Sequence, residues 1–194
     1  LVFSDSIFFN PSGRERLFYG DNMPERGDAF RAMLRAYRLS METVVIRRSA
    51  LDPLSEWFDP RFEVIEEKDL FLRVAHDWHV DLVEEALAKW RIHEGSWTWT
   101  RKPLFPHESE MMLDKFVLLY PGFESDYAEE LVAARASISY QYALIDWEAG
   151  RRSAARRRLR PIMFRNKRMF ASYVGSFIPY GLFRKGLSRL RVLP

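Results

Sequence analysis

The sequence predicts a mixed α/β fold, a partial sheet with flanking helices, followed by a helical C-terminal region. Two strand-like segments lie at the ends of the first hundred residues, "LVFSDSIFFN" at 1–10 and "VDLVEEALAKWRIH" at 80–93. Between them, residues 66–78 repeat apolar side chains with the 3.6-residue period of an amphipathic helix. After residue 106 the pattern is helical, and prolines rather than strand signals interrupt it.

Each element is expected from a local signal. Asp28 is the expected N-cap of the first helix, Asp126 and Glu129 form a capping box for the longest one, and Gly150 ends it. In chain order we expect a strand at 1–10, a loop at 11–27, a helix at 28–40, a short buried strand at 41–49, a brief helix or turn at 50–59, a helix at 66–78, one or two strands at 80–93, a loop at 94–106, helices at 107–119 and 125–150, and helical pieces over 151–194 broken at Pro161 and Pro179.

Charge sets the last part of the chain apart. From Arg151 onward there are 13 Lys and Arg residues and no Asp or Glu, although the whole chain has a formal net charge of only +3. We therefore divide the chain into residues 1–106, a helical trailer at 107–150 and a basic, aromatic-rich tail at 151–194. The interleaved aromatics favour an interfacial segment that meets an anionic membrane surface, with nucleic acid less favoured and a solvated basic extension as the alternative.

Other features exclude classes of protein. The chain has no cysteine, which excludes a disulfide scaffold, a thiolate metal site and a cysteine nucleophile. No apolar run is long enough to span a membrane, since the nearest, at 169–183, contains Gly175 and Pro179. The chain opens on Leu1 without the sections of a signal peptide, and we interpret it as a piece of a longer protein.

Glu67 is in an unusual place on the helix expected at 66–78. It falls at the centre of the apolar stripe, whereas Asp69 and Arg73 lie opposite and are expected to form an ordinary pair on a polar face. A carboxylate facing an apolar stripe must be desolvated or hydrogen-bonded, and desolvation is the usual way to make a carboxylate basic enough to accept a proton. The alternative, which accounts well for Glu66, is an acid that complements the helix dipole. The stripe consists of Leu70, Phe71, Val74 and Trp78.

Two further pairs are candidate binding residues. Arg91 and His93 are two residues apart at a strand end, so they project to one side, where they could address a phosphate or, through the imidazole, a metal. Trp97 and Trp99 share a side if "SWTWT" is extended, and two indoles can form a platform for sugars or bases. The alternatives are a surface arginine with a core histidine, and two tryptophans that cover a core edge.

Taken together, these residues resemble the C-terminal half of family 2 glycosyltransferases with the GT-A fold. The matching stretches are "LVFSDSIFFNPSG", "METVVIRRSAL", "FDPRFEVIEEKDLFLRVA" and "LAKWRIHEGSWTW". They run in the family's order over about residues 1–100, and residues 101–150 look like the helical trailer of many members. The resemblance implies that residues 1–106 are the C-terminal half of a GT-A-like catalytic domain.

The resemblance also implies roles for the candidate residues. The second acid before "DLFLR" is the family's proposed base, usually Asp, and Glu66 and Glu67 hold the two acidic places here. Arg91 and His93 would lie near the donor diphosphate, with His93 a weak candidate metal ligand. The acceptor-side tryptophans complete the expected site. No Asp-x-Asp, the motif that holds Mn or Mg in the family, occurs in the sequence, so we expect a catalytically incomplete fragment.

The expected activity of the full-length protein is transfer of a sugar from a nucleotide-sugar to an acceptor hydroxyl with inversion. The acceptor would be a carbohydrate or a lipid-linked glycan, in polysaccharide or glycoconjugate synthesis, with a divalent metal as cofactor. We expect a cytoplasmic protein at the inner face of the membrane. The alternative is a non-catalytic binding module whose basic tail contacts membrane or nucleic acid.

Overall fold

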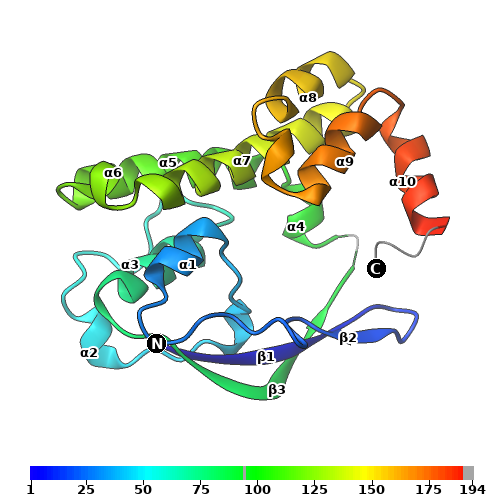
Figure 1. Cartoon of the computed structure of the whole chain (residues 1–194). Helices are drawn as coiled ribbons and strands as arrows, with labels where there is room; N and C mark the ends of the chain where they lie inside the picture. The colour runs from blue at the N-terminus through cyan, green and yellow to red at the C-terminus, as the bar shows by residue number, and fades with distance from the viewer. Residues whose placement is uncertain (94, 190–194) are drawn as a thin grey trace. The chain divides into compact units, whose positions relative to one another are not determined.

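The computed structural model describes residues 1–93 and 95–189 and divides the chain into two compact units, Leu1–Ala134 and Arg135–Pro194. The division falls inside α7, the longest helix (Figure 1). The strands are β1 (Val2–Phe9), β2 (Glu15–Leu17) and β3 (Asp81–Arg91). The helices are α1 (Phe30–Arg35), η1 (Met41–Thr43), α2 (Arg48–Leu51), α3 (Glu66–Asp77), α4 (Trp97–Thr100), α5 (Leu104–Leu119), α6 (Phe123–Asp126), α7 (Ala128–Glu148), α8 (Arg152–Leu159), η2 (Met163–Arg165), α9 (Lys167–Gly175) and α10 (Tyr180–Arg189).

The first unit is mixed α/β and contains a small mixed sheet in the order β2-β1-β3 (Figure 1). β1 runs antiparallel to β2, with Ile7 opposite Leu17, and parallel to β3, with Phe8 opposite Trp90. The register of β1 and β3 shifts around Asp5, which is a local irregularity in the ladder. The strands expected at 1–10 and 80–93 are confirmed, and β2 is an addition within the segment predicted to be loop.

The central part of β1 buries polar residues, and each is satisfied by neighbouring segments. The Asp5 carboxylate accepts hydrogen bonds from the backbone N–H groups of Ser6, Tyr19 and Gly20 at 2.7, 3.0 and 3.3 Å. The Ser6 and Ser40 hydroxyls lie 2.6 Å apart. Because these bonds tie the strand to residues 19–20 and 40, they fix the segments on either side of α1 against the sheet.

One expected element is wrong, and another is shorter than expected. Residues 41–49 contain the one-turn helix η1 and an isolated bridge between Val45 and Val2, and Val45 is 69% exposed, so this is not a buried strand. The first helix begins at Phe30 rather than 28, and Ala29, not Asp28, is its N-cap. The apolar run within residues 41–49 predicted a buried strand, but the folded protein leaves Val45 in this run exposed.

The second unit is helical, and its core combines the later half of α7 with the tail. A buried cluster brings Ala136, Tyr140 and Ala143 of α7 together with Leu159, Ile162 and Met169. The Tyr140 hydroxyl lies 3.0 Å from that of Ser172, which links α7 to α9. The tail is therefore not an isolated extension but part of a folded unit. The described helices α8, η2, α9 and α10 confirm the expected breaks at Pro161 and Pro179.

Candidate functional site

A cavity of about 360 Å³ in the first unit collects the predicted catalytic acids and one of the tryptophans. Its walls include aromatic rings and carboxylates, together with the aliphatic and hydroxyl side chains of Leu39, Ser40, Met41, Val64 and Thr98. The rings come from Phe8, Phe18, Trp90, Trp97 and Phe105. The carboxylates come from Glu42, Glu63, Glu66 and Glu67. Such a lining suits a hydroxyl-rich organic ligand, because rings can pack on its C–H faces while carboxylates accept its O–H groups.

The acids enter the cavity from the first turn of α3, whose start is fixed by a carboxylate of another helix. Ile65, the N-cap residue of α3, makes no side-chain cap. Instead, the buried Glu108 of α5 accepts the backbone N–H groups of Glu63, Val64 and Ile65 at 3.0, 3.0 and 3.2 Å. An anion at this position satisfies N–H groups beside the positive end of the helix. Glu108 therefore fixes the positions of Glu66 and Glu67.

The rest of α3 is anchored by buried charges, which corrects the expected surface pair. Asp69 and Arg73 do pair, at 3.0 Å, but they are 0% and 3% exposed. Lys115 of α5 lies 2.9 Å from both Asp69 and Asp59. A hydrogen bond from Arg61, followed by one from Lys115, holds the pKa of Asp59 well below its usual range although burial opposes this. The cluster clamps α3 to α5 and to the preceding loop.

The histidine near the C-terminal end of α3 packs among aromatic rings. The His76 ring stacks on Tyr120 with centroids 3.9 Å apart and meets Phe30 edge-on at 5.0 Å. Its Nδ1 lies 2.6 Å from Asp77. His76 is thus part of an aromatic cluster at the C-terminal end of α3 rather than a candidate ligand.

Glu67 has the electrostatic properties of a proton acceptor near neutral pH. Burial is the main effect and raises the pKa of Glu67 to about 7, with the negative charge of Glu66 adding to it. Backbone N–H groups and the Lys68 ammonium act in the opposite direction but are outweighed. A carboxylate with a pKa near the working pH is both ionised often enough and basic enough to take a proton.

Polar groups around Glu67 are desolvated as well. Burial lowers the pKa of Lys68 to about 8, although the Glu67 charge counteracts this, and its ammonium donates to the Ser109 hydroxyl at 3.2 Å. Burial and the nearby Glu67 charge raise the pKa of Tyr37 far above its usual range. Within the described residues, the Tyr37 hydroxyl and Glu66 Oε2 are buried without a hydrogen-bond partner.

The two tryptophans separate in the structure. Residues 97–100 form the single turn α4 instead of an extended segment, so side chains two apart point in different directions. Trp97 lines the cavity, where the Arg101 guanidinium lies 5.2 Å from its ring centre and pairs with Glu63. Trp99 does not line it, and its ring lies 5.5 Å from the Lys102 ammonium. The predicted two-indole platform is wrong.

The predicted diphosphate residues lie outside the cavity. Arg91 ends β3, and its guanidinium lies 5.5 Å from the ring of Phe9, the residue opposite it in β1. His93 is exposed and its carbonyl accepts the Ser96 N–H at 3.1 Å. Neither is among the residues that line the cavity. Over the described part of the chain, no group of three or more His, Asp or Glu side chains is arranged to hold a metal ion.

Sequence patterns missed several lining residues. Glu42, Glu63 and Trp90 come from η1, the segment before α3 and β3, so no local motif unites them. One available signal was the alternation along β3, which predicts that Trp90 shares the less exposed face with Ala86 and Ala88. The structure adds that Trp90 meets Phe8 edge-on at 4.7 Å, and that Phe8 stacks on Phe18 at 4.8 Å.

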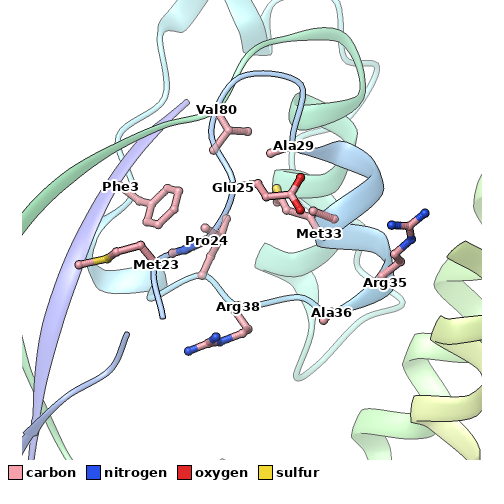
Figure 2. Close-up of a pocket in the computed structure, with 12 residues that line it drawn as sticks. Phe3, Met23, Pro24, Glu25, Ala29, Met33, Arg35, Ala36, Arg38 and Val80 are labelled. Carbon is pink, nitrogen blue, oxygen red and sulfur yellow. The ribbon is translucent and has the colours of Figure 1, made fainter. Parts of the chain in front are cut away.

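A second cavity, of about 260 Å³, is shown in Figure 2 and has a different character. Phe3 and Val80 line it from the sheet side, and Ala29 and Met33 from the region of α1 (Figure 2). None of the predicted site residues lines it. Because Glu67, the carboxyl whose pKa burial raises to about 7, lines the first cavity and not this one, we place the candidate site in the cavity that contains Glu67.

Comparisons with protein-family models, with curated proteins and with solved structures find no match to this chain. The fold and the cavity therefore carry the functional argument by themselves.

Proposed function

We propose that the cavity at the start of α3 is the acceptor site of a glycosyltransferase and that Glu67 is its general base. The observation that carries this proposal is a desolvated carboxylate, with its pKa near 7, at the wall of a cavity lined by rings and acids. In an inverting transfer, a base takes the proton of an acceptor hydroxyl while the oxygen attacks the sugar carbon and the nucleotide diphosphate leaves. Glu67 has the basicity for this step.

The other lining groups have supporting roles in the proposal. Trp97 and Trp90 offer faces for the acceptor sugar, and Glu66, which also lines the cavity, accepts a hydrogen bond from one of its hydroxyl groups. Glu108 is a positioning residue, because it fixes the backbone from which both acids project. Reacting groups must be held within a few tenths of an ångström of the productive geometry, so the hydrogen bonds accepted by Glu108 should affect the rate of transfer.

The proposal confines this chain to the acceptor half of the reaction. The described residues include no group of three or more candidate metal ligands, and Arg91 and His93 lie outside the cavity. Binding of the nucleotide-sugar and its metal is therefore assigned to residues of a longer protein. By the same reasoning, the 194-residue chain should bind acceptors without turning over nucleotide-sugars.

Acceptor binding can be tested directly on this chain. Nuclear magnetic resonance would follow the indole N–H signals of Trp90 and Trp97 during titration with a panel of neutral glycosides. We expect at least one glycoside to shift both signals, Trp97→Ala to weaken binding, and Trp99→Ala to leave it unchanged. Glu67→Gln should bind as well as the wild type because it keeps the shape of the side chain. If no glycoside shifts either indole at millimolar concentration, the acceptor-site assignment is wrong.

A further inference from the structure

The outward side of α9 carries apolar side chains that the second unit leaves uncovered. Phe170 and Val174 are four residues apart, so they lie on one stripe of the helix, and Phe177 continues it beyond the last turn. These three are 46%, 54% and 56% exposed. Phe164 is 80% exposed and stacks on Phe170, with ring centres 6.1 Å apart. We call Phe164, Phe170, Val174 and Phe177 the α9 face.

The α9 face is not the side by which this helix joins its own unit. Met169, Ser172 and Gly175 form the opposite stripe and are buried. At Gly175 the approach is so close that an added Cβ would lie 2.3 Å from the Phe183 ring and 2.9 Å from that of Trp147. The core of the unit is therefore complete without the α9 face, and large rings at its surface require another explanation.

Uncompensated positive charge surrounds these rings. Residues 151–189 contain no Asp or Glu. Arg165 follows Phe164 directly, and Lys167 precedes Phe170 by one helical turn, so both cations border the face. Arg160, Arg165 and Lys167 are exposed, and their side chains make no hydrogen bond or ion pair within the described residues. By contrast, Arg151 and Arg158 are both paired with Asp146 of α7.

We propose that the α9 face docks on the surface of an anionic phospholipid bilayer, with its rings in the headgroup region and Arg165 and Lys167 against the lipid phosphates. A helix with aromatic and aliphatic side chains bordered by cations is the pattern of interfacial binding. None of the helices within 1–93 and 95–189 is long and apolar enough to cross a membrane. The rings favour a phospholipid bilayer over nucleic acid, because a nucleic-acid duplex offers backbone phosphates but no apolar layer into which the rings can insert.

This inference goes beyond the proposed transferase and does not depend on it. It uses only residues of the second unit, whereas the acceptor site lies in the first. Loss of membrane binding would leave acceptor binding in place, and failure to bind glycosides would leave the docking proposal untouched.

Co-sedimentation of the full chain with phospholipid vesicles tests the proposal. The wild type should bind vesicles that contain one third phosphatidylglycerol at least tenfold more tightly than pure phosphatidylcholine, and measurable binding should persist at 0.5 M NaCl. The double variant Phe164→Ser, Phe170→Ser should weaken binding at least tenfold at both 0.1 M and 0.5 M NaCl. Arg165→Glu with Lys167→Glu should weaken it mainly at 0.1 M NaCl, because salt screens the charge contribution.

Matched controls make the result specific to this face. Leu118→Ser removes an 88% exposed apolar side chain from α5 and should change nothing. Arg14→Glu, in an exposed loop, should have little effect. The proposal is overturned if the wild type binds neither vesicle, if duplex DNA binds more tightly than anionic lipid, if the controls weaken binding as much as the α9-face variants, or if the serine variants abolish a dimer instead of membrane binding. Thermal melting of each variant confirms that it folds.

Discussion

Replacing Glu67 by glutamine should stabilise the protein above neutral pH. Burial raises the pKa of this carboxyl from 4.5 to about 7 in the folded protein, so between these values the folded state holds a proton that the unfolded chain has lost. The contribution of Glu67 to stability therefore falls as pH rises through this window. Above pH 7, where Glu67 is ionised in both the folded and the unfolded protein, its charge lowers the free energy of unfolding by about 3 kcal/mol.

The assay is urea denaturation of the wild type and Glu67→Gln at half-unit steps from pH 4.5 to 8. The difference in unfolding free energy should be smallest at pH 4.5 and grow to about 3 kcal/mol in favour of the variant by pH 8. Lys68, whose pKa burial lowers to about 8, remains protonated in both states through most of the window and adds little to this slope. Glu85→Gln, at an exposed position of β3, is the control and should follow the wild-type profile.

A flat difference across this pH range would refute the reasoning. It would mean that Glu67 remains solvated in the folded protein, although its place at the cavity wall indicates that it is desolvated. A variant that is less stable than the wild type at pH 8 would be equally damaging, because it would assign Glu67 a structural bond instead of a destabilising charge. A residue that costs stability while holding a reactive group in place is typical of functional sites.

Substitutions at three further positions test the interactions that hold the fold together. Glu108→Ala should destabilise the first unit by roughly 3 kcal/mol in urea denaturation, since it leaves three backbone N–H groups without their acceptor, and Glu108→Gln should cost less because it retains a weaker one. Lys115→Met should lower the free energy of unfolding by roughly 3 kcal/mol, because two buried carboxylates lose the cation that they share. An unchanged midpoint of urea denaturation would show that the neighbouring arginines neutralise these carboxylates without Lys115. Gly150→Ala should cost about 1–2 kcal/mol in thermal melting, as its φ of 79° is left-handed, and a neutral result would contradict that conformation.

Local patterns predicted the position of the acids well. The 3.6-residue period located α3 and placed Glu67 toward the apolar side, because amphipathic periodicity is a property of the segment itself. The same period assigned Asp69 and Arg73 to a solvated face and was wrong there. Lys115, 46 residues from Asp69, makes that face a buried ionic cluster, and such a partner leaves no mark in the local sequence.

The remaining errors have related causes. Val45 belongs to an apolar run that has only an isolated bridge to Val2, so composition overstated its burial. The platform considered for Trp97 and Trp99 required an extended segment, but residues 97–100 form a helical turn that separates the two side chains. The charge change at Arg151 indicated a distinct tail, yet it could not indicate that α7 supplies half of the core of that unit.

The central claim is that Glu67 accepts the proton of an acceptor hydroxyl, and sugar transfer by a protein that joins this chain to a donor-binding segment tests it most directly. The measurement is the pH profile of kcat/KM for the wild type, Glu67→Gln and Glu66→Gln. We expect the wild-type rate to rise with pH through about 7, where Glu67 loses its proton. Glu67→Gln should lose roughly 10²- to 10⁴-fold in rate with acceptor binding intact, and Glu66→Gln should lose much less. Full activity of Glu67→Gln, or equal losses in both variants, would contradict the assignment of Glu67 as the base.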